Sequence, residues 1–310
     1  MSRSHSAGAT FAAVTALALA LTGCGADSDP LDDSGSDGGS SSSIAIGSAN
    51  FPESELLAEI YAQALEAEGL EVERSFNIGA RELYLQALQD GSIDLLPEYN
   101  GALLSALTEG GAPEGVSSPD DVYEALQDVL PEGTEVLEQS DAEDKDTLTV
   151  TQETADEYGL ETIADLVPVA DQLVIGAGPE WAERYQGLPG LKEVYGLEFK
   201  EFRPLDAGGP LTIGALLDGT IDVGNVFSTD SAIKVNDLVV LEDPEELYLA
   251  ENILPLIRSE KVDETVTEAL NAVSAALTTE NLTEYLARIQ VDKEDTATVA
   301  EAFLSDTGLV

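Results

Sequence analysis

Ala-Leu-Gln-Asp-Gly-Ser-Ile-Asp at residues 87 to 94 and Ala-Leu-Leu-Asp-Gly-Thr-Ile-Asp at residues 215 to 222 are two copies of one short phrase. Each copy has the pattern of an amphipathic helix end, a tight Asp-Gly turn and the first residues of a buried strand. The repetition indicates one α/β unit built twice, although such a phrase also recurs by chance in α/β proteins. Because chains with two α/β lobes usually bind their ligand between them, the phrase favours a clamshell binding protein.

The N-terminus predicts export. Arg3 is followed by an apolar run from Thr10 to Leu21 that is too short to span a bilayer and is typical of a signal peptide over residues 1–23. Leu-Thr-Gly-Cys at 21–24 resembles the bacterial lipobox, in which the new N-terminal cysteine is lipidated. Cys24 is the only cysteine of the chain; the alternative is an ordinary signal peptide with an incidental cysteine. We expect a lipid on Cys24 to hold the protein at the extracytoplasmic face of the cell membrane.

The composition and the order of apolar patterns predict the domain organisation. Residues 24–43, rich in Gly, Ser and Asp, are expected to form a disordered tether. The remainder is long enough for two lobes, which we place at 44–146 with 253–310 and at 147–252. Two crossings between them would make a two-stranded hinge. The expected fold is therefore α/β, a two-lobe periplasmic-binding-protein-like (type II) clamshell, and we expect a monomer.

Apolar periodicity predicts the individual elements. Asn50 is a candidate cap for the first helix, which has Pro52 near its first position. Strands are expected at 44–48, 72–76, 93–96, 147–150, 173–177, 198–203, 221–226, 238–241 and 253–257. Helices are expected after 50, at 81–89 and 118–130, before 158, after 162, before 218, and at 263–277, 279–290 and 295–304.

Charge and residue usage exclude several classes of function. The chain has 13 basic and 61 acidic residues, a net charge of −48, which excludes nucleic acid as a partner. Its one histidine, His5, lies in the signal peptide, so histidine-dependent hydrolases and histidine-ligated zinc are not expected. There is no phosphate-binding loop, and no cofactor or metal is expected. A two-carboxylate hydrolase and an adhesive surface protein remain as alternatives.

Several segments in order resemble a known family. They are Ile-Gly-Ser-Ala-Asn-Phe at 46–51, Asp-Gly-Ser-Ile-Asp-Leu-Leu-Pro-Glu-Tyr-Asn-Gly at 90–101, Glu-Thr-Ile-Ala-Asp-Leu at 161–166, and Phe-Ser-Thr-Asp-Ser-Ala-Ile at 227–233 followed by 237–243. Over residues 44 to 258 the chain resembles the substrate-binding lipoproteins of glycine betaine, carnitine and choline ABC transporters.

The resemblance implies a non-enzymatic protein that delivers a quaternary ammonium osmoprotectant to an ABC permease. A quaternary ammonium offers no hydrogen-bond donor and is held by the faces of aromatic rings. The motif match assigns this role to Tyr99, in Pro-Glu-Tyr-Asn-Gly, and to Phe227, where the family commonly has Tyr. The alternative for either ring is a place in the core or the hinge.

The chain departs from the family pattern at three positions, and at two of them an acid or amide stands where an aromatic residue is expected. Ala49 stands where Lys is common, Asp146 falls where a cage tyrosine is expected, and Glu251 or Asn252 falls where another aromatic residue is expected. Carboxylates would attract a cation directly. The alternative is that the alignment slips and these acids belong to the general surface excess.

Arg184, in Glu-Trp-Ala-Glu-Arg, lies where the family can place an arginine for a ligand carboxylate. It could instead pair with Glu180 or Glu183, in which case the acids favour a purely cationic ligand such as choline. Another small cationic or polar metabolite is a further alternative. Four candidates at strand ends can either contact the ligand or cap helices: Asn50, Ser228, Thr229 and Asp230.

Overall fold

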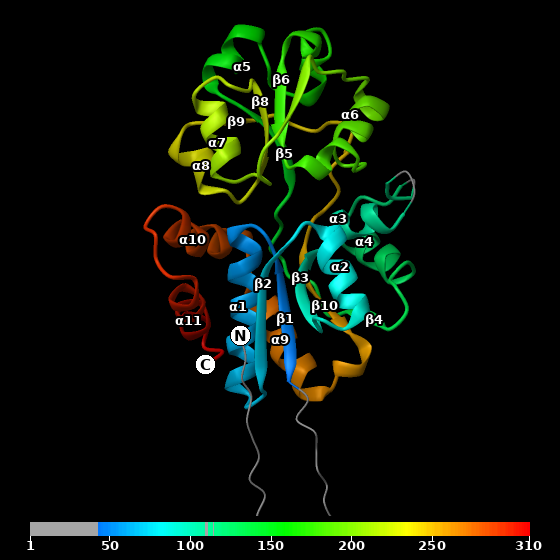
Figure 1. Ribbon diagram of the computed structural model, residues 1–310, viewed down its shortest axis with the longest axis vertical. Coiled ribbons are helices and arrows are strands. Elements are labelled where there is room, and N and C mark those ends of the chain that lie inside the picture. Colours follow the sequence, from blue (N-terminus) through cyan, green and yellow to red (C-terminus); the bar gives the residue numbers. More distant parts are fainter. Residues whose placement is uncertain (1–42, 109–110, 114) are drawn as a thin grey trace, which may run out of the picture. The chain divides into compact units, whose positions relative to one another are not determined.

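The computed structural model describes residues 43–108, 111–113 and 115–310. This part contains two five-stranded mixed sheets, each flanked by helices, as Figure 1 shows. We name each sheet with its helices a lobe. The expected signal peptide, Cys24 and nearly all of the tether lie outside the described residues. Within the described ranges, no helix combines the length and apolarity needed to cross a membrane.

The first sheet has the strand order β2-β1-β3-β10-β4. β1 is parallel to β2 and β3, whereas β10 is antiparallel to β3 and β4. Successive residues of β10 enter different cores, with Ile253 in one cluster and Leu254 in the other. The strands are β1 (Ile44–Ala49), β2 (Val72–Gly79), β3 (Leu95–Tyr99), β4 (Thr134–Val136) and β10 (Ile253–Arg258).

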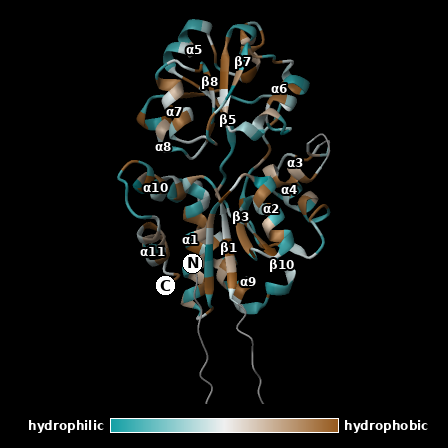
Figure 2. Cartoon of the chain, in the orientation of Figure 1, coloured by the Kyte–Doolittle hydropathy of each residue, from teal (hydrophilic) through white to brown (hydrophobic). Residues whose placement is uncertain are grey.

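Helices cover both faces of the first sheet. One core packs α1 (Pro52–Ala67), α9 (Glu264–Ala276), α10 (Thr279–Gln290) and α11 (Thr296–Thr307). The other packs α2 (Arg81–Asp90), α3 (Asn100–Leu107) and α4 (Pro119–Gln127). Figure 2 shows the consequence for β1 and β10, which are largely hydrophobic because both of their faces are covered.

The second sheet repeats the same order as β7-β6-β8-β5-β9. β6 is parallel to β7 and β8, and β5 is antiparallel to β8 and β9. The strands are β5 (Asp146–Val150), β6 (Val174–Ala177), β7 (Glu201–Pro204), β8 (Val223–Phe227) and β9 (Val239–Val240). The helices are α5 (Gln152–Tyr158), α6 (Leu188–Tyr195), α7 (Pro210–Leu217) and α8 (Ser231–Val235).

The repeated phrase forms the same local structure in both lobes. Gly91 and Gly219 end their helices with φ of 77° and 73°. Asp94 then accepts a hydrogen bond from the Ala45 amide of β1 at 3.0 Å, and Asp222 accepts one from the Val174 amide of β6 at 2.7 Å. These aspartates tie each turn to the neighbouring strand, which confirms that one unit is built twice. The following strands begin at Leu95 and Val223, each two residues later than expected.

The two lobes are joined by two antiparallel crossing segments, 140–144 and 251–253. The Ser140 amide donates to the Ile253 carbonyl at 2.8 Å, and the Asp144 amide donates to the Glu251 carbonyl at 3.1 Å. The Asn252 side chain also donates to the Ser140 carbonyl at 3.0 Å. The expected two-stranded hinge is therefore present.

Some local predictions were wrong. The helix expected after Thr162 is a short 3₁₀ turn, Ile163–Leu166. Asn50 does not cap α1; the cap position is Phe51, and the Ser54 hydroxyl accepts from the Ala49 amide instead. Four elements were not expected, namely α3, β4, α6 and α8.

Gly101 provides a test of how closely the first lobe packs on the chain that leads into the second crossing segment. A Cβ at Gly101 would lie 2.3 Å from the Ala250 carbonyl oxygen, whereas one at Gly214, in α7, would meet nothing within 4 Å. We expect Gly101→Ala to lower the free energy of unfolding by about 1–3 kcal/mol because backbone must move. Gly214→Ala should raise it by up to about 1 kcal/mol because alanine is the better helix former. Urea unfolding of both variants checks this; equal effects would contradict it.

Candidate functional site

A pocket forms where the carboxyl ends of parallel strands from both sheets meet the crossing segments. β1 leads into Asn50 and Phe51, β3 ends at Tyr99, and β8 ends at Phe227. The loop after β6 supplies Glu180, Trp181 and Arg184. The space left between these side chains is about 50 Å³. Such a crevice beyond the carboxyl ends of strands is where α/β proteins bind ligands.

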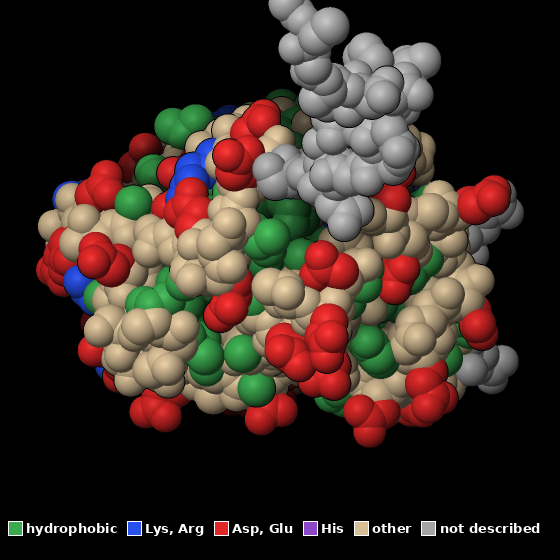
Figure 3. Space-filling view, turned by 90° about the horizontal axis from the view of Figure 1, so that it is seen from below, with side chains coloured by type: hydrophobic (Ala, Val, Ile, Leu, Met, Phe, Trp, Pro, Cys, Tyr) green, Lys and Arg blue, Asp and Glu red, His purple; other side chains and the backbone are tan. Residues whose placement is uncertain are grey.

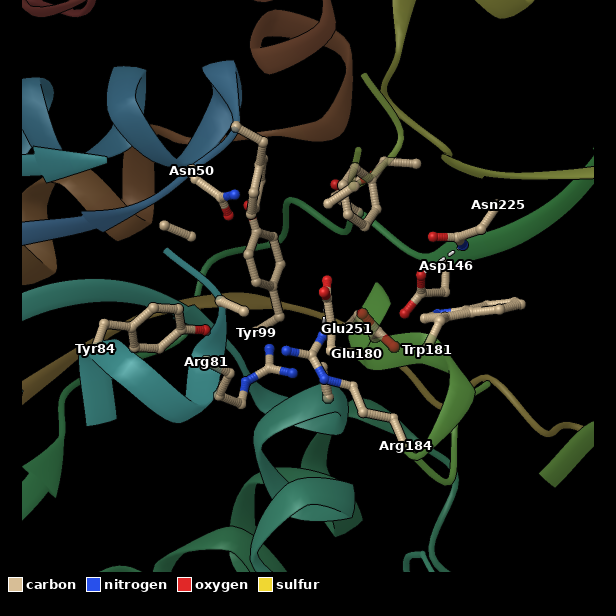
Figure 4. Close-up of a pocket in the computed structure, with 17 residues that line it drawn as sticks. Asn50, Arg81, Tyr84, Tyr99, Asp146, Glu180, Trp181, Arg184, Asn225 and Glu251 are labelled. Carbon is tan, nitrogen blue, oxygen red and sulfur yellow. Dashed lines mark hydrogen bonds and ion pairs between the residues drawn. The ribbon is translucent and has the colours of Figure 1, made fainter. Parts of the chain in front are cut away.

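Three aromatic rings, two from the first lobe and one from the second, line this pocket. The Phe51 and Phe227 ring centroids are 5.0 Å apart, and those of Phe51 and Tyr99 are 6.2 Å apart. Trp181 and Tyr84 add two further aromatic walls. Figure 4 shows Tyr99 and Trp181 reaching into the site from different elements. A cation placed between these rings would meet several π faces.

Carboxyl groups of the hinge region line the same pocket. Asp146, at the start of β5, accepts a hydrogen bond from the Asn225 side chain at 2.7 Å, and Glu251 accepts one from Gln186 at 2.7 Å. Burial raises the pKa of Asp146 and holds the pKa of Glu251 well above its ordinary value. Both carboxyl groups therefore lack a sufficient positive partner within the protein.

Glu53 joins both lobes and the hinge through its buried carboxyl group. It accepts a hydrogen bond from the Tyr99 hydroxyl at 2.7 Å, in the first lobe, and another from the Thr229 hydroxyl, in the second. Asp144, in the first crossing segment, accepts from the Thr229 amide at 3.0 Å and is hydrogen-bonded to Glu53. Burial raises the pKa of both acids, and we infer that they share a proton.

Two arginines reach the pocket with their guanidinium groups largely engaged. Arg81 donates through Nε and Nη2 to buried Glu98 at 2.8 and 3.0 Å. Arg184 donates through Nε and Nη2 to Glu82 of the first lobe at 3.0 and 2.9 Å. Nη1 of each arginine makes no hydrogen bond to any residue in the described ranges; for Arg184 it lies 4.0 Å from Glu180. Each Nη1 could thus donate a hydrogen bond to a ligand oxygen.

The structure brings most of the sequence-predicted residues together. Six of the seven candidates line one pocket: Asn50, Tyr99, Asp146, Arg184, Phe227 and Glu251. Thr229 does not line it and instead binds Glu53 and Asp144. Arg184 pairs mainly with Glu82 rather than with Glu180 or Glu183, which corrects the expected partner. Of the weaker candidates, Asp230 is the N-cap of α8, and Ser228 donates to Asp144 at 3.1 Å.

Sequence reasoning missed several pocket residues. Phe51 and Trp181 lie inside quoted motifs, and Trp181 is the only tryptophan of the chain, so both carried a signal that was not used. Arg81 is the first residue of α2, two residues after the end of β2, and this position after a strand also could have been noticed. Asp144 had no local signal because its position depends on the pairing of the crossing segments. Among the described residues, no cluster of three or more metal-ligating side chains occurs.

Two curated relatives span nearly the whole folded part of the chain. The carnitine transport binding protein of Listeria monocytogenes is 26% identical over 275 residues, covering 86% of this chain and 87% of that protein. The glycine-betaine-binding protein of Pseudomonas aeruginosa is 26% identical over 280 residues, covering 86% and 88%.

The fold matches solved structures of two-lobe binding proteins. One described as a glycine betaine/carnitine/choline ABC transporter has a TM-score of 0.66 and 25% identity, and covers 86% of this chain and 99% of that one. A choline-binding protein in complex with choline has a TM-score of 0.62 at 16% identity, covering 86% and 89%, and supports the fold alone. The expected α/β two-lobe clamshell of type II is thereby confirmed.

The family described as the substrate-binding domain of ABC-type glycine betaine transport systems matches residues 42–306. This span includes both sheets, the crossing segments and every residue of the pocket. The chain therefore belongs to the family of substrate-binding domains of ABC-type glycine betaine transport systems.

Proposed function

We propose that this protein captures a quaternary ammonium compound in the pocket between its lobes and delivers it to an ABC permease at the extracytoplasmic face of the membrane. The observation that supports this most strongly is the group of Phe51, Tyr99 and Phe227 rings beside buried carboxyl groups. Rings can hold a methylated ammonium that offers no donor. Within the family, such proteins are transport components rather than enzymes, and we propose no catalytic role.

The ammonium would lie between the rings, with Asp146 and Glu251 as the nearest compensating charges. Each ring contributes on the order of 0.5–2 kcal/mol, more where water is excluded. If the ligand also has a carboxylate, Nη1 of Arg81 and of Arg184 are its candidate donors. This arrangement suits glycine betaine or carnitine.

A second candidate is a cation without a carboxylate, such as choline or another small cationic metabolite. The observation that favours it is that Glu98 and Glu82 already engage Nε and Nη2 of the two arginines. A ligand carboxylate would then have single rather than bidentate contacts with each guanidinium. The acids of the pocket would carry the recognition of the cation.

We further propose the division into lobes at 44–146 with 253–310 and at 147–252, a monomeric state, and a lipid on Cys24 preceded by a cleaved signal peptide of residues 1–23. The lipobox-like Leu-Thr-Gly-Cys sequence supports the anchor. Figure 3 shows acidic side chains over the face that it displays, with few basic ones, which fits the net charge of −48. We propose no nucleic-acid partner.

Closure of the lobes would depend on Glu53 and Asp144. Thr229 of the second lobe bonds both acids, so separation of the lobes would break these contacts. The neighbouring charged groups are also acidic: Asp230 raises the pKa of Glu53, and Glu251 raises that of Asp144. The shared proton therefore avoids two buried negative charges in contact.

The raised pKa of Asp144 gives a testable pH dependence. The folded state retains a proton at pH values where the unfolded chain has lost it, so stability falls as pH rises from the unfolded pKa of about 3.9 to the folded pKa. Asp144→Asn supplies a permanent N–H donor in place of the proton. We expect the wild type to lose stability relative to this variant as pH rises from about 4, by at most about 1.4 kcal/mol per pH unit. Parallel stability curves from urea unfolding would contradict the shared proton.

Calorimetric titration of the purified protein with glycine betaine, choline and carnitine, at two salt concentrations, tests the ligand class. We expect saturable binding of at least one compound. Tighter binding of glycine betaine than of choline would indicate that Arg81 and Arg184 receive a carboxylate, and binding of choline alone would indicate recognition by the acids. If none of the three compounds binds, the proposed ligand class is refuted.

Phe227→Leu is the matched variant for that titration, because leucine keeps the apolar bulk but has no π face. We expect it to weaken binding by about 2- to 30-fold, which corresponds to the loss of one cation–π contact. Phe227→Tyr, which keeps the ring, serves as the control and should bind almost normally. Equal affinity of the leucine variant and the wild type would remove Phe227 from the site.

The lipid anchor is tested by Cys24→Ser in the full chain. The wild type should fractionate with membranes and carry a diacylglycerol-modified N-terminal cysteine by mass spectrometry. The variant should lose both, because serine lacks the thiol that receives the lipid. An unmodified wild-type cysteine would show that the lipobox resemblance is incidental.

A further inference from the structure

A second, larger space adjoins the pocket on the side of α8 and α10. This space is open to solvent on one side and has a volume of about 390 Å³, against about 50 Å³ for the pocket. Four residues line both spaces: Phe51, Asp144, Ala207 and Phe227. We call this space the side groove. Its walls come from the first lobe through Leu286 and Ile289 of α10 and from the second through Ile213 of α7 and Val235 of α8.

The side groove is bounded by direct contacts between the lobes. At one end the Thr229 hydroxyl donates to Glu53. Toward α10, the Gln290 side chain accepts from the Ser231 amide at 3.1 Å and donates to Asp230 at 2.8 Å. The side groove therefore lies between places where the two lobes are in direct contact, so it is present even though the lobes are not separated there.

The lining of the side groove suits an apolar occupant. Val235 and Val291 expose 62% and 49% of their surface, which is high for large apolar side chains. The charged groups along it are already hydrogen-bonded within the protein: Glu53 and Asp144 as described above, Asp230 to Gln290, and Lys293 to the Gln290 carbonyl at 2.6 Å. An apolar chain would thus displace water without leaving these groups unpaired.

Gly208 lies beside the Phe227 ring at the junction between the pocket and the side groove, and it has no side chain that would displace the ring. A Cβ there would lie 2.9 Å from the Phe227 ring, and the residue has φ of +64°, which favours glycine. The ring that lines both spaces can therefore pack directly on backbone.

We propose that the side groove is a second subsite, which takes an extended apolar substituent of a ligand whose quaternary ammonium lies in the aromatic pocket. This inference rests on the proposed function. The ligand class becomes quaternary ammonium compounds that carry a flexible alkyl or acyl chain, in addition to the compact osmoprotectants.

Calorimetric titration with tetramethylammonium, butyltrimethylammonium and hexyltrimethylammonium tests the subsite without the complication of ester hydrolysis. We expect binding to tighten by up to about fourfold for each methylene that enters the side groove, because each buried methylene contributes about 0.8 kcal/mol. Ile213→Asn and Ile289→Asn, which place an amide in the wall, should reduce this gain while leaving tetramethylammonium binding nearly unchanged.

Leu211→Asn is the matched control, since Leu211 lies on the same helix as Ile213, is 65% exposed and does not line the side groove. It should keep the full gain. Tetramethylammonium binding without any gain from the longer chains, or equal loss in the control and groove variants, would overturn the subsite and leave the proposed function standing. Failure of every quaternary ammonium to bind would overturn both.

Discussion

The pairing of the two crossing segments determines where the functional side chains lie. Backbone hydrogen bonds between 140–144 and 251–253 bring the end of each sheet to the same place. Asn100 reinforces this pairing, because its side chain accepts from the Asn252 amide at 2.8 Å and from the Gly101 amide at 2.7 Å. Asp144 and Glu251 reach the pocket because they belong to these segments, and Asp146 because it follows the first of them. The site is therefore a consequence of topology as much as of its individual residues.

The pocket combines two kinds of attraction for a cation. Rings attract without carrying a charge of their own, so their burial costs little. Buried carboxyl groups attract more strongly but are expensive to ionise in a low-dielectric site. In this chain, Phe51, Tyr99 and Phe227 form an apolar wall, and the acids sit at the hinge. An ammonium between them would gain from both without forcing the empty pocket to hold several uncompensated charges.

Much of the fold could be predicted from the sequence because both lobes repeat one local pattern. Ile93 and Ile221 are almost fully buried, and Asp94 and Asp222 accept equivalent hydrogen bonds from backbone amides. The duplicated sequence therefore corresponds to two structurally equivalent units. The site was predictable where it follows a strand end within a motif, as for Tyr99 and Phe227. It was not predictable for Arg184 with Glu82, because that pairing joins residues far apart in sequence and in different lobes. Asp144 was not predictable either, because its position depends on the pairing of two crossing segments that are far apart in sequence.

The buried acids of the pocket differ in their ionisation from the exposed acids that give the chain most of its negative charge. Burial raises the pKa of Asp144, Asp146 and Glu251, so these acids retain their protons to a higher pH than exposed acids do. A quaternary ammonium arriving beside them would favour their ionised forms and lower these pKa values. Binding of a permanent cation would then be coupled to release of protons from the hinge. In this arrangement the ligand supplies the positive charge that the buried acids lack within the protein.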